Sequence, residues 1–508
     1  MDRSFHIFGH VLSYHSEEMF MCKGRLLCVA LGSLLVSTSA MAAPILLATG
    51  TLTGSSAGAN QDLSGLTGAL ENGLPGNILG GLGSGLAYAG GNTFLSVPDR
   101  GPNATPYNSA VDETVSYISR FQTLTMTLTP SGGALPFSLG VALDGTTLLY
   151  SPTPLVYGSG AGLGNKIDGV TPIGSGAPAQ NTASAFYFTG RSDNFDPAKT
   201  SGNPADARFD PEAIRVSPDG KSVFVSDEYG PYVYQFDRQT GARIKSFTLP
   251  ANLDIANLAP VGTAEISGNA SGRTANKGME GLAITPDGTT LVGIMQAALL
   301  QDAAIPASKK LLRIVTIDVA TGATHEYGYM LTAGSGVSEI VAINDHEFLV
   351  DERDGAGLGD GSSAVVKKVF RINLAGAVDI TGLTGAAAVA KAVGKTLVLD
   401  VVSLLNANGI TSDQIPAKLE GLALGPDVMF GGILEHTLFF ANDNDFLLNV
   451  AGPNSFFVFG LTDADLPGFQ QQIFVPEASS LAVFGAGFLA LIGFGLIRGR
   501  TRWLGQRI

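Results

Sequence analysis

Cysteine and histidine are scarce in this chain of 508 residues. Its two cysteines, Cys22 and Cys28, both lie near the N-terminus, in a region that we interpret below as a cleaved export signal. The mature protein then has no thiol, which excludes disulfides, thiolate catalysis and thiolate zinc sites. Only His325, His346 and His436 lie beyond that region, far apart and without ligand spacing. A histidine metal centre and a Ser-His-Asp hydrolase are therefore not expected.

Charge is also scarce, and acidic residues outnumber basic ones. Only 15% of the residues are charged, and the formal net charge is −14. Nucleic acid is excluded as a partner, because its backbone needs clustered Lys and Arg. The acidic balance favours cations as partners, or it simply keeps an exported protein soluble.

Glycine and apolar residues, in contrast, are abundant. The chain has 66 Gly and 25 Pro, and 45% of its residues are hydrophobic. This composition predicts an all-β protein with many short strands joined by turns, and it is apolar enough to build cores. A chain of this length is too long to fold around one ordinary hydrophobic core, unless a repeat architecture spreads that core along the chain.

The N-terminal region has the pattern of a secretion signal. Two basic residues precede an apolar run that ends in small residues at Ala42. We expect a signal peptide region over residues 1–43, with cleavage by signal peptidase after Ala42 or Ala43. Residues 1–18 are unlike a leader, so a start at a later methionine is a further hypothesis.

The C-terminal region, residues 475–508, has the pattern of a membrane-attached tail. Residues 478–497 carry no charge and are followed by three arginines, which predicts one transmembrane helix with a cytoplasmic basic end. Val475-Pro476-Glu477 stands just ahead of it. This order resembles the PEP-CTERM sorting tails, which implies processing by an exosortase-type enzyme; an ordinary tail anchor is the alternative. We expect a periplasmic or cell-surface protein, anchored at least transiently in the inner membrane.

The middle of the chain, residues 44–470, repeats one unit. In the clearest copy an apolar strand opens with Glu212, turns at Pro218-Asp219-Gly220 and leads into a second apolar strand that closes with Asp227 and Glu228. Strands that are apolar on nearly every residue are buried on both faces. The repeat predicts a β-propeller of about six blades, with a double β-sandwich as the alternative. Further copies begin near Ser84, Met279, Ser338 and Leu419, and a weaker one spans 139–150.

Acidic residues recur at the same places in these units. In an antiparallel hairpin, residues equidistant from the turn lie opposite each other, so the opening Glu and the closing acids meet at one end. If the hairpins are the inner strands of blades, these ends gather around one mouth of the channel. Oxygen ligands without histidine or thiolate point to Ca²⁺, with Mg²⁺ second. The candidate metal ligands are Asp99, Glu212, Asp227, Glu280, Glu339, Glu420, Asn442 and Asp443.

The same segments carry a family resemblance. Asp99-Arg100-Gly101, Pro211-Glu212-Ala213-Ile214, Lys277-Gly278-Met279-Glu280-Gly281, Val350-Asp351-Glu352-Arg353 and Leu419-Glu420-Gly421-Leu422 resemble the signature blocks of the phytase-like family. That family is described as having esterase-like activity of phytase. The resemblance spans roughly 80–460 and implies a propeller, a divalent metal and a hydrolase.

These observations lead to one main functional hypothesis, an exported Ca²⁺-dependent hydrolase of small phosphate esters or related esters. The metal would bind the substrate oxyanion and lower the pKa of an attacking water. Arg100, Lys277 and Arg353 would stabilise developing negative charge, and Glu228 or Glu352 would act as general base. The alternatives are a non-catalytic, Ca²⁺-stabilised propeller of the extracellular matrix or cell surface, and a lactonase-like propeller.

Overall fold

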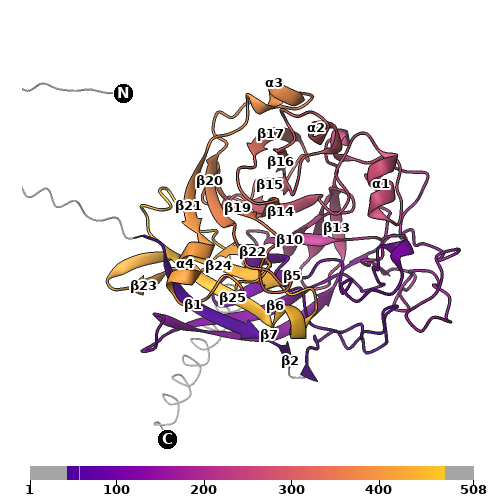
Figure 1. Cartoon of the computed structure of the whole chain (residues 1–508), viewed down its shortest axis with the longest axis horizontal. Coiled ribbons are helices and arrows are strands. Elements are labelled where there is room, and N and C mark those ends of the chain that lie inside the picture. Colours follow the sequence, from indigo (N-terminus) through magenta and orange to yellow (C-terminus); the bar gives the residue numbers. More distant parts are fainter. Residues whose placement is uncertain (1–42, 56–57, 475–508) are drawn as a thin grey trace, which may run out of the picture. The chain divides into compact units, whose positions relative to one another are not determined.

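Five antiparallel sheets of four main strands each, the blades, form the framework of this computed structural model, which describes residues 43–55 and 58–474 (Figure 1). Blade 1 consists of β4 (Gly85–Tyr88), β5 (Thr93–Val97), β6 (Arg120–Pro130) and β7 (Phe137–Leu148). Blade 2 consists of β10 (Pro211–Val216), β11 (Ser222–Asp227), β12 (Val233–Asp237) and β13 (Arg243–Phe247). Blade 3 consists of β14 (Met279–Ile284), β15 (Thr290–Met295), β16 (Leu311–Asp318) and β17 (Thr324–Met330).

The last two blades follow the same order, with one exception. Blade 4 consists of β18 (Gly336–Ala342), β19 (Glu347–Arg353), β20 (Lys367–Asn373) and β21 (Lys395–Asp400). Blade 5 consists of β22 (Lys418–Leu424), β24 (Ile433–Asp443), β25 (Asn454–Leu461) and, as its outermost strand, β1 (Ile45–Leu52) from the start of the propeller. A short strand, β23 (Val428–Phe430), pairs with the beginning of β24. Blade 5 therefore joins the two ends of the array.

Five hydrophobic clusters fill the gaps between neighbouring blades. One cluster, for example, packs Ile294 of blade 3 against Ile340 and Val350 of blade 4, and a corresponding cluster lies between blades 5 and 1. Fully burying such a side chain contributes about 1.5–3 kcal/mol. Since every gap between neighbours is filled, the ring is closed, and the protein is an all-β propeller of five blades.

The expected number of about six blades was therefore wrong by one. Residues 139–150, which look like a weak sixth unit in the sequence, lie mostly in β7, the outer strand of blade 1. The Asp144-Gly145 pair is not a turn there. It lies at a register shift in the pairing of β7 with β6, opposite Thr123 and Leu124, so the strand continues through it as a bulge.

The inner strands are buried on both faces, as their continuous apolar character predicts. Every residue of β10, β11 and β14 is buried, whereas only two of the twelve residues of β7, at the edge of blade 1, are buried. We call the end of the channel where the inner strands begin the mouth, and the end where they finish the base.

One buried ion pair lies between the inner strands, between the mouth and the base. Arg215 of β10 lies 2.9 Å from the carboxylate of Glu339 on β18, and its guanidinium also donates to the carbonyl oxygens of Leu86 on β4 and Ile340 on β18. Both side chains are buried. The pair thus links strands of three blades across the axis of the ring.

The segment that follows β25 crosses the base. The Gln471 amide donates to the carbonyl oxygen of Gly425, and the Gln472 amide donates to that of Val216. Phe474 then packs on Tyr88, with ring centroids 5.9 Å apart. The described chain therefore ends at the base, on the far side of the ring from the mouth.

Short elements occupy the connections. The helices are α1 (Gly262–Gly268), α2 (Leu300–Ala303), α3 (Gly385–Val389), α4 (Val401–Ala407) and α5 (Leu448–Ala451), with 3₁₀ turns at Ser109–Val111 and Ala251–Leu253. Two small ribbons pair β2 (Gly54–Ser55) with β3 (Gly58–Ala59) and β8 (Tyr150–Ser151) with β9 (Phe186–Tyr187). No helix within residues 43–55 and 58–474 is both long and apolar enough to cross a membrane. The predicted signal, the PEP-CTERM-type tail and its helix over 478–497 lie outside the described residues.

Candidate functional site

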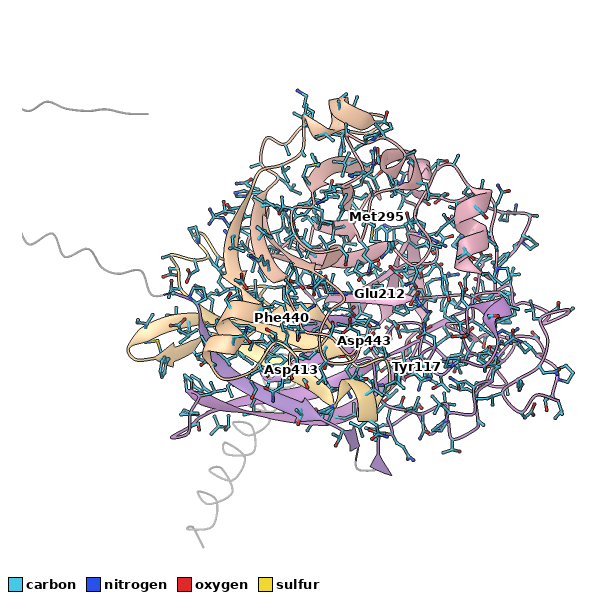
Figure 2. All side chains as sticks on the ribbon, viewed as in Figure 1. Tyr117, Glu212, Met295, Asp413, Phe440 and Asp443 are labelled. Atoms are coloured by element: carbon cyan, nitrogen blue, oxygen red, sulfur yellow. The ribbon has the colours of Figure 1, made fainter. Side chains whose placement is uncertain are left out.

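A cavity of about 350 Å³ opens at the mouth of the propeller. Inner strands of three blades bring Glu212, Glu280 and Glu420 to it, and the residues that follow β5 and β11 bring Asp99, Arg100 and Glu228. Glu212 is labelled in Figure 2. In all, seven carboxylates and four cationic side chains line it. The carboxylates are Asp99, Glu212, Glu228, Glu280, Asp360, Glu420 and Asp445, and the cations are Arg100, Lys277, Arg353 and Lys418.

A β-bulge opens each of these inner strands and aims the acidic side chains. The pairing register shifts between Pro211 and Ile214, between Met279 and Gly281, and between Leu419 and Gly421. The skipped residues include all three glutamates, and a bulge of this kind commonly re-aims a side chain near a functional site. In a strand without a bulge, the regular alternation of side chains would point these three glutamates in a different direction.

Blade 4 has the bulge one residue earlier relative to its glutamate. Its register shifts between Val337 and Glu339, so the skipped residue is Ser338, and Glu339 stands where blades 3 and 5 have Gly281 and Gly421. Glu339 consequently does not line the cavity at the mouth. It pairs with Arg215 inside the channel and accepts hydrogen bonds from the backbone N–H groups of Leu282 and Ile340.

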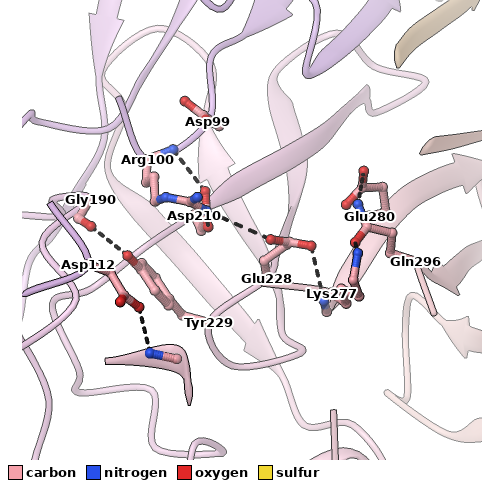
Figure 3. A network of polar contacts seen from close by, with 12 residues as sticks. Asp99, Arg100, Asp112, Gly190, Asp210, Glu228, Tyr229, Lys277, Glu280 and Gln296 are labelled. Carbon is pink, nitrogen blue, oxygen red and sulfur yellow. Dashed lines mark hydrogen bonds and ion pairs between the residues drawn. The ribbon is translucent and has the colours of Figure 1, made fainter. Parts of the chain in front are cut away.

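Three buried carboxylates converge at the cavity, two of them in its wall and the third, Asp210, beside them. Asp210, Glu212 and Glu228 each offer an oxygen atom, and these atoms lie within 4.8 Å of one another. Asp210, which precedes β10, accepts hydrogen bonds from the backbone N–H and the guanidinium of Arg100, at 2.9 and 2.5 Å (Figure 3). Asp227 lies behind this group, where its carboxylate accepts the backbone N–H groups of Asp210, Tyr229 and Gly230.

Across the cavity, Glu280 and Glu420 share Arg353. The guanidinium of Arg353 pairs with Glu420 and lies 3.5 Å from Oε1 of Glu280. Oε1 of Glu280 also accepts the amide of Gln296 at 2.7 Å, and Lys277 donates to the other side of that amide at 3.2 Å. Oε2 of Glu280 is buried and has no hydrogen-bond partner.

The third part of the wall comes from blade 5 and the loop after β5. Lys418 pairs with Asp443 and, at 2.9 Å, with Asp445. Asp99 accepts the backbone N–H of Gly101. The side-chain oxygen of Asn442 accepts the backbone N–H of Ser455 at 2.5 Å instead of facing the cavity.

Of the predicted site residues, the structure brings Asp99, Arg100, Glu212, Glu228, Lys277, Glu280, Arg353 and Glu420 together in the cavity. Glu352 lies outside it. Its carboxylate pairs with Lys395 and accepts hydrogen bonds from the Tyr329 hydroxyl at 2.6 Å and the Ala333 N–H at 2.7 Å. Sequence reasoning missed Asp210, although its position two residues before Glu212 could have indicated it.

Burial and mutual repulsion raise the pKa values of the clustered acids. For Glu212 the main cause is burial, followed by the negative charges of Glu280, Asp210 and Glu228, which together hold its pKa well above the usual range. The pKa values of Asp99, Glu228 and Glu280 are raised for the same reasons. Burial opposes the charge of Arg100, but the neighbouring carboxylates outweigh it and raise the pKa of that guanidinium.

These features fit a divalent metal ion bound by oxygen ligands. Closely spaced, buried carboxylates ionise together only where positive charge compensates them, and the four cations of the wall are outnumbered. The unpartnered Oε2 of Glu280 leaves one further buried acceptor in the wall. Ca²⁺ and Mg²⁺ prefer such oxygen donors.

Comparisons with solved structures return matches at low similarity. A hydrazine synthase chain from Kuenenia stuttgartiensis is 13% identical, with 73% of this chain and 79% of that chain covered and a TM-score of 0.28. A periplasmic gluconolactonase from Pseudomonas aeruginosa is 12% identical, with 82% and 99% covered and a TM-score of 0.31. No functional conclusion follows from likeness at this level.

A sequence relative and a family profile give closer matches. An uncharacterized secreted protein from Arthroderma benhamiae is 29% identical over 334 residues, which are 55% of this chain and 60% of that protein. The chain thus matches somewhat less than two thirds of the relative's length. The profile of the phytase-like family, described as esterase-like activity of phytase, matches residues 77–446, well over half of the chain and every inner strand of the ring. This chain belongs to the phytase-like family.

Proposed function

We propose that the protein is an exported, divalent-metal-dependent hydrolase of phosphate esters or related esters. The observation that carries the proposal is the convergence of carboxylate oxygens of Asp210, Glu212 and Glu228 within 4.8 Å, beside a cavity that four cationic side chains also line. Family membership supports a hydrolase. Export is supported by the signal pattern at the N-terminus and by the relative that is named as secreted.

Asp210, Glu212 and Glu228 would hold the metal ion, with Ca²⁺ as the leading candidate. When bound, such an ion polarises an ester oxygen as a Lewis acid. Asp210 is held in place by Arg100, and Glu228 is held by the backbone N–H of Gly278, which donates to it at 3.1 Å. The fold of the ring itself therefore positions these carboxylate ligands.

The cationic side chains differ in how much of their charge is left for a substrate. Arg100 is engaged by Asp210, and Arg353 is shared between Glu420 and Glu280. In the described part of the chain, Lys277 donates to the neutral amide of Gln296 instead of to a carboxylate. We assign Lys277 the main contact with the substrate oxyanion, with Arg353 as the second.

Glu280 is suited to proton transfer. Burial and the nearby charges of Glu228 and Glu420 raise its pKa, so Oε2 keeps a proton to a higher pH than an ordinary carboxyl does. An acid of this kind can donate its proton to the oxygen of a leaving alcohol. Glu352, in contrast, is separated from the cavity and is fully engaged by Lys395 and Tyr329.

The test combines metal binding with turnover. The purified full chain is stripped with chelator and titrated with Ca²⁺ or Mg²⁺ by calorimetry, and is then assayed on phosphomonoester, phosphodiester, carboxylester and lactone substrates. Asp210→Asn and Glu228→Gln should each weaken metal binding at least tenfold, because each removes one of the charged ligands. Asp413→Asn changes an exposed carboxylate that does not line the cavity; it is the matched control and should bind metal as the wild type does.

Each outcome decides between the hypotheses. Metal-dependent turnover that is lost in Glu280→Gln, with metal binding retained, supports the hydrolase and the assigned proton donor. Metal binding without turnover on any substrate favours the non-catalytic, metal-stabilised propeller, and turnover of lactones alone favours the lactonase. No metal binding, or binding that Asp210→Asn and Asp413→Asn affect equally, overturns the proposed site.

A further inference from the structure

One hairpin exposes large apolar side chains. The residues from Val428 to Leu434 read Val-Met-Phe-Gly-Gly-Ile-Leu and include no charge. Met429, Phe430, Ile433 and Leu434 have exposed fractions of 60%, 41%, 44% and 41%. We call residues 428–434 the apolar tip; β23 within it projects from the ring in Figure 1.

The geometry of the apolar tip prevents it from hiding these side chains. Gly431 and Gly432 form a two-residue turn with φ values of 58° and 84°, a conformation that favours glycine and gives a tight hairpin. Met429 pairs with Leu434 and Phe430 with Ile433, so adjacent pairs point to opposite faces of the ribbon. Both faces are therefore apolar, whereas a hairpin that merely covers a core has one polar face.

The propeller covers little of the apolar tip. The Phe430 ring contacts Phe137 of β7, with centroids 6.5 Å apart and an edge-on arrangement. Phe430 nevertheless keeps 41% of its surface exposed. A contiguous exposed apolar group of this kind indicates a surface that meets a partner or a membrane.

The apolar tip lies at the base, where the described chain also begins and ends. β22 runs from the mouth to Leu424 and leads directly into it, and the Gln471 amide contacts Gly425 at its foot. Ile45 pairs with Gly460 near the end of β25, which places the N-terminal end of the ring at the base as well. Four residues after Phe474 the chain enters the uncharged stretch 478–497.

We propose that the apolar tip inserts into the interfacial layer of a lipid bilayer to which the C-terminal segment attaches the propeller. The occupant is neutral phospholipid, because the acidic side chains Asp427 and Asp463 flank the foot of the tip and disfavour an anionic surface. Attachment through residues 478–497 holds the tip at a high effective concentration beside the bilayer, so a few apolar side chains suffice. The base then faces the membrane and the mouth faces away from it, whether or not the cavity catalyses a reaction.

Tryptophan fluorescence tests this arrangement directly. Trp503 is the one tryptophan of the chain, so Trp503→Phe provides a silent background. In that background, full-length Phe430→Trp is reconstituted into phosphatidylcholine vesicles with and without acyl-brominated lipid. Bromine quenches indole only over short distances, and we expect at least a twofold loss of emission.

The matched control is Val365→Trp, which lies just before β20 on the side of the mouth and is 69% exposed. Its emission should change by less than a fifth in the same vesicles. Adding Met429→Ser and Leu434→Ser to Phe430→Trp should reduce the quenching, while far-UV circular dichroism stays unchanged.

Three results would overturn the proposal. The first is equal quenching at positions 430 and 365, and the second is failure of the full chain to float with the vesicles. The third is an unquenched, blue-shifted Phe430→Trp emission together with a dimer in sedimentation, which would show that a second copy of the chain covers the tip instead.

Discussion

Replacing Arg215 with Met removes the group that ties three blades together inside the channel. The guanidinium of Arg215 donates to carbonyl oxygens of Leu86, Ile214 and Ile340 at 2.7, 2.5 and 3.0 Å, and it lies 2.9 Å from the Glu339 carboxylate. Methionine fills much of the volume but donates no hydrogen bond. Leaving these buried acceptors without a donor should lower the free energy of unfolding by about 3 kcal/mol near neutral pH.

The pH dependence of this loss is the more specific part of the prediction. Burial raises the pKa of Glu339 to about 8, in spite of the opposing attraction of Arg215. Without Arg215 the pKa of Glu339 rises further, so the folded variant holds its proton to a higher pH than the wild type does. An acid that binds its proton more tightly when folded loses stability as pH rises, and the two proteins diverge above about pH 8.

Urea unfolding followed by far-UV circular dichroism at pH 6.5 and pH 9 measures the effect. We expect the destabilisation by Arg215→Met to be larger at pH 9 by up to about 1.4 kcal/mol, the equivalent of one pKa unit. The double variant Arg215→Met, Glu339→Leu should recover part of the stability and lose the extra pH dependence, because no buried carboxyl remains. A loss below 1 kcal/mol, or one that is the same at both pH values, would refute the reasoning.

Two further predictions concern other contacts. In the wild type, hydrogen bonds and charge from Asp427 and Asp463 outweigh the opposing burial and raise the pKa of His436. His436→Gln should therefore lower the free energy of unfolding by about 1 kcal/mol below pH 6.5, and by progressively less as pH rises through the folded-state pKa. An equal loss at pH 5.5 and pH 9 would contradict this prediction. A Cβ at Gly83 would lie 2.0 Å from the carbonyl carbon of Asn442. Gly83→Ala should therefore lower the free energy of unfolding, measured in urea, by more than about 2 kcal/mol. A Cβ at Gly132 meets nothing within 4 Å, so Gly132→Ala should not cause this loss.

The fold class and most of the cavity wall could be predicted from the sequence because the repeated hairpins carry strong local signals. Apolar strands, Pro-Asp-Gly turns and acidic ends recur in order, and antiparallel pairing alone places Glu212 near Asp227. The structure pairs Pro211 with Asp227, one residue away from that expectation. The register of a hairpin can therefore be predicted from the sequence wherever a short turn fixes it.

The position of Glu339 could not be predicted because a bulge is not visible in the residue pattern. Ser338-Glu339-Ile340 resembles Met279-Glu280-Gly281 as a string, yet the skipped residue is Ser338 in one blade and Glu280 in the other. A shift of one residue in a strand sends a side chain to the opposite face. Glu339 thus became a partner of Arg215 instead of a member of the cavity wall.

The blade number was misjudged for a related reason. The Asp144-Gly145 pair in the sequence has turn chemistry, but the long partner strand β6 pairs with residues on both sides of it. The pairing of β7 with β6 therefore outweighed the local preference of Asp144-Gly145 for a turn. Asp210 was missed because it directly precedes β10 and was not counted with the residues of that strand; the fold brings its carboxylate beside Glu228.

The pairing of β1 with β25 sets the order in which this protein can be completed. Leu52 and Asn454, which are bonded in blade 5, are separated by 402 residues of chain. β1 must therefore keep an open edge until β25, almost the last strand of the ring, has been synthesised. Closure of the ring is then expected to be a late step of folding, and a chain that stops before residue 454 has no partner for β1.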